Sequence, residues 1–142
     1  MTREHATYRL RMATGFLTEA QQDVSLARWR SAVDNAQLAA ENGVKAVLAL
    51  IGPVGRTHAP TGPLREALER AVYPAALHDR LRQLIEHAEA LGYDVHVQTD
   101  YGDEATGRTP WELFTESDAR QAVSKAARVV DLARHIVEAI AG

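Results

Sequence analysis

The chain has 142 residues, of which 46% are hydrophobic and 25% charged, and this size and composition predict one soluble globular domain over residues 1–142. It contains no cysteine, which excludes disulfide frameworks, thiolate metal sites and cysteine nucleophiles and favours a cytoplasmic protein. The formal net charge of −3 argues against a surface that coats nucleic acid, and the longest apolar run, residues 46–51, is too short for a membrane span.

Two long amphipathic helices are predicted in the first third of the chain. The first runs from Glu4 to about Asp23, and the second, from Trp29 to Gly52, carries small or apolar residues at every third or fourth position. The short break between them, with Ser25 as a possible N-cap for the second helix, makes the two helices antiparallel neighbours. Because glycine weakens a helix interior, Gly43 predicts that another helix approaches closely at this point.

An irregular loop rich in glycine and proline follows at residues 52–62. It leads into a short helix over residues 63–72, and after Pro74 a further helix extends from about Ala75 to Leu91. Residues 93–99 alternate apolar and polar side chains as a strand does, but no second run of this kind could pair with them. We therefore expect an extended loop segment there, with strand pairing across a dimer edge as the minor alternative.

Signals for helix starts mark the last part of the chain, after a polar loop over residues 100–107. The run from Thr109 to Glu112 combines an N-cap, a proline at the first helical position and an acid at the third, and it predicts a helical turn. Thr115 and Asp118 offer a similar capping box, which opens a last helix from Ser117 to about Ile140. Together these elements predict an all-α, up-and-down helical bundle of four long helices plus short extra helices.

The second predicted helix carries Gln37, Glu41 and Lys45 at four-residue spacing. Further along the chain come, in order, Gly52, Thr57-His58, the loop Asp100-Tyr101-Gly102-Asp103, Pro110 and the helix from Asp118. From Trp29 to Ile140 this order resembles the HEPN family, the higher eukaryotes and prokaryotes nucleotide-binding domains. The chain departs from the family pattern at His58-Ala59-Pro60, where the family has His-Asp-Leu, and at Asp100 and Gly102, where the family has Arg and Pro.

The resemblance implies a helical bundle, often a homodimer, with one of two functions. It is either a nucleotide- or RNA-binding module that accompanies a nucleotidyltransferase partner in a toxin–antitoxin arrangement, or a metal-independent ribonuclease. We favour the binding module over the enzyme, and a structural adaptor without a ligand is the third hypothesis. No cofactor is expected.

HEPN ribonucleases pair an arginine with a histidine a few residues later, so that the two can orient a ribose hydroxyl and stabilise phosphate charge. The chain offers the pairs Arg80–His87, Arg82–His87 and Arg128–His135, all within predicted amphipathic helices. Fourteen arginines and six histidines produce about two such pairs by chance, so surface ion pairs or solvated side chains are the favoured interpretation. No Glu is followed by His three residues later, and no metal site is predicted.

The two irregular loops are longer than helix packing needs, and we expect them to meet at one end of the bundle in a concave, mostly positive pocket. Its predicted ligand-binding residues are Lys45, Arg56, His58, Tyr101, Asp103, Arg108 and Trp111. The cationic side chains would bind phosphates, Tyr101 or Trp111 would stack on a base, and His58 would donate a hydrogen bond. The alternatives are turn contacts for the loop residues, a helical ion pair between Lys45 and Glu41, and a core or interface role for Trp111.

Overall fold

Helix α2 (Trp29–Ala49) lies at the centre of the structure, a computed structural model that describes residues 2–141. The other elements are α1 (Thr2–Ser25), α3 (Thr61–Glu69), the 3-10 turn η1 (Ala75–Leu77), α4 (His78–Glu89), α5 (Tyr93–Tyr101), α6 (Pro110–Leu113) and α7 (Glu116–Ala141). Fourteen of the 21 residues of α2 are buried, so neighbouring elements cover this helix on more than one side.

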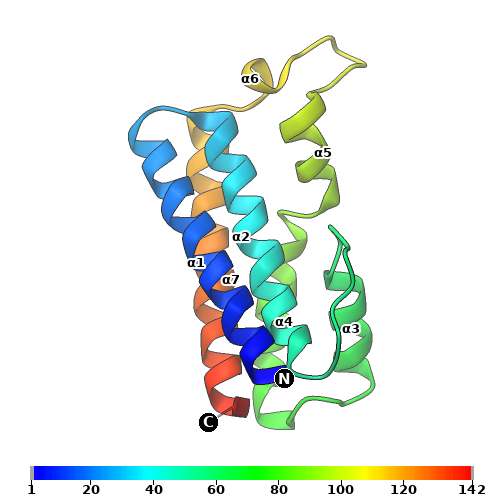
Figure 1. The fold of residues 1–142 in the computed structure, drawn as a ribbon. Helices are drawn as coiled ribbons and strands as arrows, with labels where there is room; N and C mark the ends of the chain where they lie inside the picture. Colours follow the sequence, from blue (N-terminus) through cyan, green and yellow to red (C-terminus); the bar gives the residue numbers. More distant parts are fainter. Residues whose placement is uncertain (1, 142) are drawn as a thin grey trace.

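Four helices form the up-and-down bundle. α1, α2, α4 and α7 lie side by side and alternate in direction along the chain (Figure 1). α2 packs against the other three, and the shorter helices α3, α5 and α6 also contact it. The predicted all-α bundle with short extra helices is therefore confirmed. None of the helices within residues 2–141 has the length and apolar character that crossing a membrane requires.

Small side chains let the long helices approach one another. α1 buries Ala6, Ala13 and Ala20 completely, at seven-residue intervals, and α2 buries six alanines. A Cβ added to Gly43 would lie only 3.0 Å from Cγ1 of Val129 on α7, which is closer than ordinary van der Waals contact. The glycine in the middle of α2 is thus explained by the close approach of α7, as the sequence predicts.

Both predicted capping boxes are present at the end of the molecule where α6 leads into α7. The Thr109 hydroxyl accepts a hydrogen bond from the backbone N–H of Glu112, and the Glu112 carboxylate accepts one from the backbone N–H of Thr109. Thr115 and Asp118 make the same reciprocal pair ahead of α7, at 3.2 and 2.9 Å. These bonds satisfy backbone groups that the helix starts would otherwise leave unpaired.

The prediction that Ser25 caps α2 is wrong. Ser25 is the last residue of α1, and its hydroxyl donates to the carbonyl of Gln22. The turn is held instead by the buried carboxylate of Asp23, whose Oδ2 accepts hydrogen bonds from Ser31 at 2.7 Å and from Asn35 at 2.8 Å. α2 also ends at Ala49, three residues before Gly52.

Residues 93–99 are helical, so the prediction of an extended segment there is also wrong. α5 satisfies its backbone groups internally, and the side chain of Arg30 on α2 donates to the carbonyl of Thr99 at 2.8 Å. α5 contacts α2 and α6. Without a partner strand, the helix is the conformation that leaves fewer backbone groups unpaired.

We expect Gly43→Val to lower the free energy of unfolding by about 1–3 kcal/mol, because the added methyl groups must displace Val129 or α7. Gly15→Ala on α1 is the matched control, since a Cβ there meets nothing within 4 Å. It should raise stability by roughly 0.5–1 kcal/mol through helix propensity alone. Urea unfolding followed by circular dichroism measures both; equal effects of the two substitutions would contradict close packing at Gly43.

Candidate functional site

A row of three polar side chains, the polar ladder, is buried along one face of α2. Gln37, Glu41 and Lys45 are only 1%, 6% and 5% exposed. Gln37 donates to Oε1 of Glu41 at 3.3 Å, and the Lys45 ammonium donates to Oε2 of Glu41 at 3.1 Å. The carboxylate of Glu41 is therefore the common acceptor of the ladder, and the helical ion pair weighed as an alternative role for Lys45 is present.

His58 joins the polar ladder from the loop between α2 and α3. Its Nδ1 lies 3.0 Å from Oε1 of Glu41, while 49% of the His58 side chain is exposed. A carboxylate can only accept, so the proton of the neutral imidazole lies on Nδ1 and Nε2 carries a free lone pair. A buried acid thus fixes the orientation of a half-exposed histidine.

A second histidine, from α5, covers the first. The rings of His58 and His96 stack with centroids 4.2 Å apart, and Tyr93 lies 6.2 Å from His96 with its side chain largely exposed. Within residues 2–141, Nδ1 of His96 and Oε1 of Gln37 are buried without a hydrogen-bond partner. A cavity of about 30 Å³ beside Gln37, Glu41 and His58 has room for about one water molecule.

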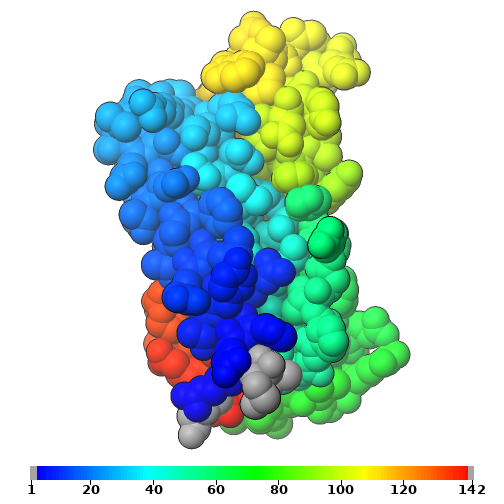
Figure 2. All heavy atoms as spheres, in the orientation of Figure 1, coloured from blue at the N-terminus to red at the C-terminus, as the bar shows by residue number. Residues whose placement is uncertain are grey.

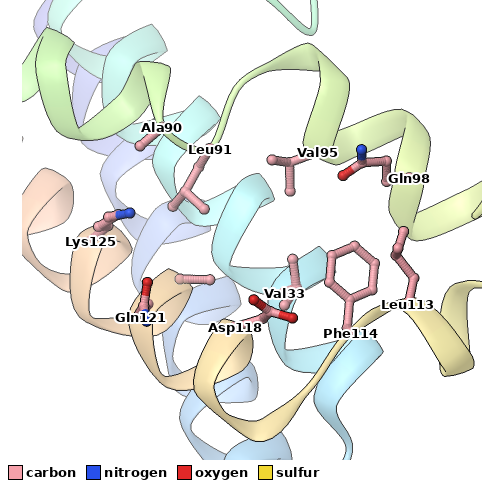
Figure 3. Close-up of a pocket in the computed structure, with 11 residues that line it drawn as sticks. Val33, Ala90, Leu91, Val95, Gln98, Leu113, Phe114, Asp118, Gln121 and Lys125 are labelled. Carbon is pink, nitrogen blue, oxygen red and sulfur yellow. The ribbon is translucent and has the colours of Figure 1, made fainter. Parts of the chain in front are cut away.

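A larger cavity, of about 300 Å³, opens between α5, α6, α7 and the first turns of α2 (Figure 3). Figure 3 shows Phe114 and Lys125 on opposite sides of this cavity, with Leu91 and Val95 along one wall. Gln98, Asp118 and Gln121 add polar groups to the lining, although Oδ2 of Asp118 already accepts the capping bonds of Thr115. The cavity can hold an apolar group, and none of the seven residues predicted for ligand binding lines it.

The structure does not bring the predicted pocket together. Lys45 and His58 meet at Glu41, and Arg56 is exposed on the same loop as His58. The other four predicted residues lie near the opposite end of α2, and they are Tyr101, Asp103, Arg108 and Trp111. At that end the guanidinium of Arg30 lies 5.5 Å from the centre of the Trp111 ring. Arg30 precedes Lys45 by fifteen residues, which corresponds to about 22 Å along a helix.

The predicted arginine–histidine pairs lie on helix surfaces. Arg82 forms an ion pair with Asp79, and the exposed Arg80 and His135 have no hydrogen bond or ion pair among the described residues. Arg128 bonds to Gln83 of α4 at 3.0 Å, which places it beside His87 in a shallow groove of about 470 Å³. An arginine and a histidine from two different predicted pairs thus come together across α4 and α7.

Four members of the site are absent from the predicted ligand-binding residues: Gln37, Glu41, Tyr93 and His96. The four-residue spacing of Gln37, Glu41 and Lys45 is visible in the sequence, but it does not show that this face of α2 is buried. His96 could not be placed because an alternating pattern predicts an extended conformation for its segment. No group of three or more His, Cys, Asp and Glu side chains in residues 2–141 is arranged to hold a metal ion.

Comparison with known proteins agrees with this architecture. A family model described as the HEPN domain matches residues 6–136. A curated protein of Methanocaldococcus jannaschii, "Putative toxin MJ1304", is 25% identical over 145 residues, covering 95% of this chain and 94% of that protein. The crystal structure of TT1696 from Thermus thermophilus has a TM-score of 0.67 at 23% identity, covering 95% of this chain and 98% of that one, and shows the same fold.

Glu41→Ala should lower the free energy of unfolding by about 3–5 kcal/mol, because it leaves the buried ammonium of Lys45 without a counter-ion. The matched control is Glu66→Ala, which removes an exposed ion pair of the same helical spacing with Arg70 and should cost at most about 0.5 kcal/mol. Replacing both partners, Glu41→Leu with Lys45→Met, should recover most of the loss. Chemical denaturation measures all three variants, and a similar loss for Glu41→Ala and Glu66→Ala would contradict the importance of the buried carboxylate.

Proposed function

The chain belongs to the HEPN domain family, and we propose that it is a HEPN module of toxin–antitoxin type that binds RNA or a nucleotide on the surface around His58. The observation that carries this proposal is the contact between His58 and Glu41. A buried carboxylate holds the imidazole by one nitrogen, so that the other nitrogen and about half of the side chain are available to a ligand.

The side chains around His58 suit a phosphorylated ligand with an aromatic base. The His58 ring can donate to a phosphate oxygen when it is protonated, and the exposed guanidinium of Arg56 lies two residues before it. Tyr93 is 54% exposed next to His96 and offers a face on which a base can stack. The Lys45 ammonium is neutralised by Glu41, so it contributes to the site by holding the carboxylate and not as a free phosphate ligand.

The toxin–antitoxin part of the proposal is supported by the relative from Methanocaldococcus jannaschii, whose name describes a toxin and which aligns with almost the whole chain. A module of this type acts together with a partner protein, and the family resemblance suggests a nucleotidyltransferase. Self-association as a homodimer through the helix faces belongs to the same proposal.

A second candidate function, metal-independent RNA cleavage, is favoured by the same histidine–carboxylate contact. Nε2 of His58 would take the proton of a ribose 2′-hydroxyl while the 2′-oxygen attacks the adjacent phosphorus. The bond from phosphorus to the 5′-oxygen would break, the 5′-oxygen would take a proton from water, and a 2′,3′-cyclic phosphate would remain. Glu41 is placed to orient His58 and to stabilise its protonated form.

Binding is tested by titrating labelled oligouridylate and oligoadenylate into the protein and measuring fluorescence anisotropy. Tyr93→Ala and His58→Ala should each weaken binding by about tenfold, since one stacking contact contributes roughly 1–3 kcal/mol. Tyr8→Ala removes another tyrosine, 51% exposed on α1, and should leave the affinity unchanged. Equal losses in all three variants, or no RNA or nucleotide binding by the unmodified chain, would contradict the proposal.

Cleavage is tested with the same RNAs in the presence of a chelator. If the chain is a ribonuclease of this kind, His58→Ala should lower the cleavage rate by about 10²-fold or more, and Glu41→Gln should lower it less. His87→Ala and Arg128→Ala are the controls, because these residues lie together in the separate groove between α4 and α7. Cleavage activity that survives His58→Ala but is lost in both controls would show that the active site lies in the groove between α4 and α7.

A further inference from the structure

Residues 100–112 form a projection at one end of the molecule, which we call the knob. It contains the end of α5, a turn and α6, and it extends beyond the long helices α1 and α2 (Figures 1 and 2). Trp111 and Tyr101 in the knob are 73% and 69% exposed, more than any other large hydrophobic side chain in residues 2–141. Neither ring is needed to cover the core of this chain.

Local hydrogen bonds hold the backbone of the knob, although it lies outside the bundle. Asp103 and Arg108 exchange two backbone hydrogen bonds, at 2.8 and 3.0 Å, and the Asp103 side chain accepts from the backbone N–H of Ala105. Gly102 has a positive φ of 70°, and a Cβ there would overlap the carbonyl of Arg108, so the turn depends on this glycine. The capping box of Thr109 and Glu112 then fixes the helical turn that carries Trp111. Because these contacts restrain the backbone of the knob, we expect the knob to lose little conformational entropy when a partner binds.

The charge of the knob decides what kind of partner it fits. Four carboxylates lie between residues 100 and 112, at Asp100, Asp103, Glu104 and Glu112, against the single guanidinium of Arg108. Hydrogen bonds from Thr109 lower the pKa of Glu112, so that its carboxylate stays ionised at neutral pH. Arg108 directs Nη2 at the carbonyls of Glu112 and Leu113 within its own turn. The net negative charge of these residues favours cationic partners over phosphates.

One arginine of the chain already binds to the knob. Arg30 lies over the Trp111 ring at 5.5 Å and within 3.7 Å of Asp100, so one guanidinium contacts both an aromatic face and a carboxylate of this region. Arginine suits such a place because its planar group stacks on rings and pairs with carboxylates. The outer parts of Trp111 and Tyr101 remain open for further contacts of this type.

We propose that the knob is a docking surface for an arginine-rich segment of a partner protein, with Trp111 and Tyr101 as aromatic anchors and the carboxylates of Asp103 and Glu104 as its ion-pair partners. Trp and Tyr are among the residue types that most often carry the binding energy at protein interfaces. The inference rests on the proposed function in one respect, the existence of a partner protein, and it does not depend on the ligand bound at His58.

The probe is a labelled peptide of alternating arginine and glycine, titrated into the full chain by fluorescence anisotropy, with the indole N–H signal of Trp111 followed by NMR. We expect binding that shifts the Trp111 signal, weakens about tenfold in Trp111→Ala and weakens severalfold in Glu104→Gln. Glu86→Gln, an exposed acid on α4, is the matched control and should have no effect. Absence of peptide binding, or binding that is insensitive to Trp111→Ala, would overturn the proposal.

The same variants separate this proposal from RNA binding at His58. Trp111→Ala should reduce peptide binding and leave the affinity for oligouridylate unchanged, whereas Tyr93→Ala should do the reverse. If oligouridylate shifts the Trp111 signal and the peptide does not, the knob belongs to the nucleic-acid site and the docking proposal is overturned. If peptide binding behaves as expected while RNA binding is absent, the docking surface stands and the proposed function around His58 fails.

Discussion

A helix surrounded by other helices needs partners inside the protein for the charged groups that it buries, and this constraint shapes the structure around α2. The carboxylate of Glu41 is the clearest case, since it accepts from Gln37, Lys45 and His58. The contact with His58 holds the loop between α2 and α3, and the stacked His96 ties α5 to the same place. Asn42 accepts from Arg9 of α1 at 3.1 Å in the same way on another side of the helix. Burying an unpaired charge would cost several kcal/mol, so these polar contacts specify which segments may lie next to α2.

The two surfaces with functional features lie at separate places along the bundle and differ in charge and chemistry. Around His58 the chain presents two imidazoles, a tyrosine and a nearby guanidinium, which suit an anionic ligand with an aromatic base. At the knob it presents two exposed aromatic rings among carboxylates, which suit a cationic one. The two surfaces are far enough apart for the two proposed ligands to bind at the same time, since the first turn of α2 and Lys45 are about 22 Å apart along the helix.

Much of the fold could be predicted from the sequence because long helices with one apolar face leave a regular pattern. The stripe on α2, the close approach at Gly43 and the capping boxes before α6 and α7 depend on residues near one another in the chain, and all were predictable. The helical conformation of residues 93–99 was not predictable, because an alternating pattern does not distinguish a strand from a short helix with few tertiary contacts. The ion pair of Glu41 and Lys45 followed from spacing, whereas the contacts of His58 with Glu41 and His96 depend on the path of two loops. Because the paths of these loops are not visible in the sequence, Trp111 and His58 were predicted to share one pocket, although they lie apart in the structure.

The extensive contact between α1 and α2 has a consequence for the order in which the chain acquires structure. These helices are neighbours in the sequence, joined by a turn of three residues, and they form the most extensive helix pair in residues 2–141. Contacts between nearby segments cost little loop entropy, so we expect the α1–α2 hairpin to form first during folding. The polar ladder then remains open on such a hairpin, because His58 and His96 arrive only with later segments. We expect Glu41 and Lys45 to stay hydrated in such a hairpin, so that the desolvation cost of this ion pair falls on the docking of the later segments.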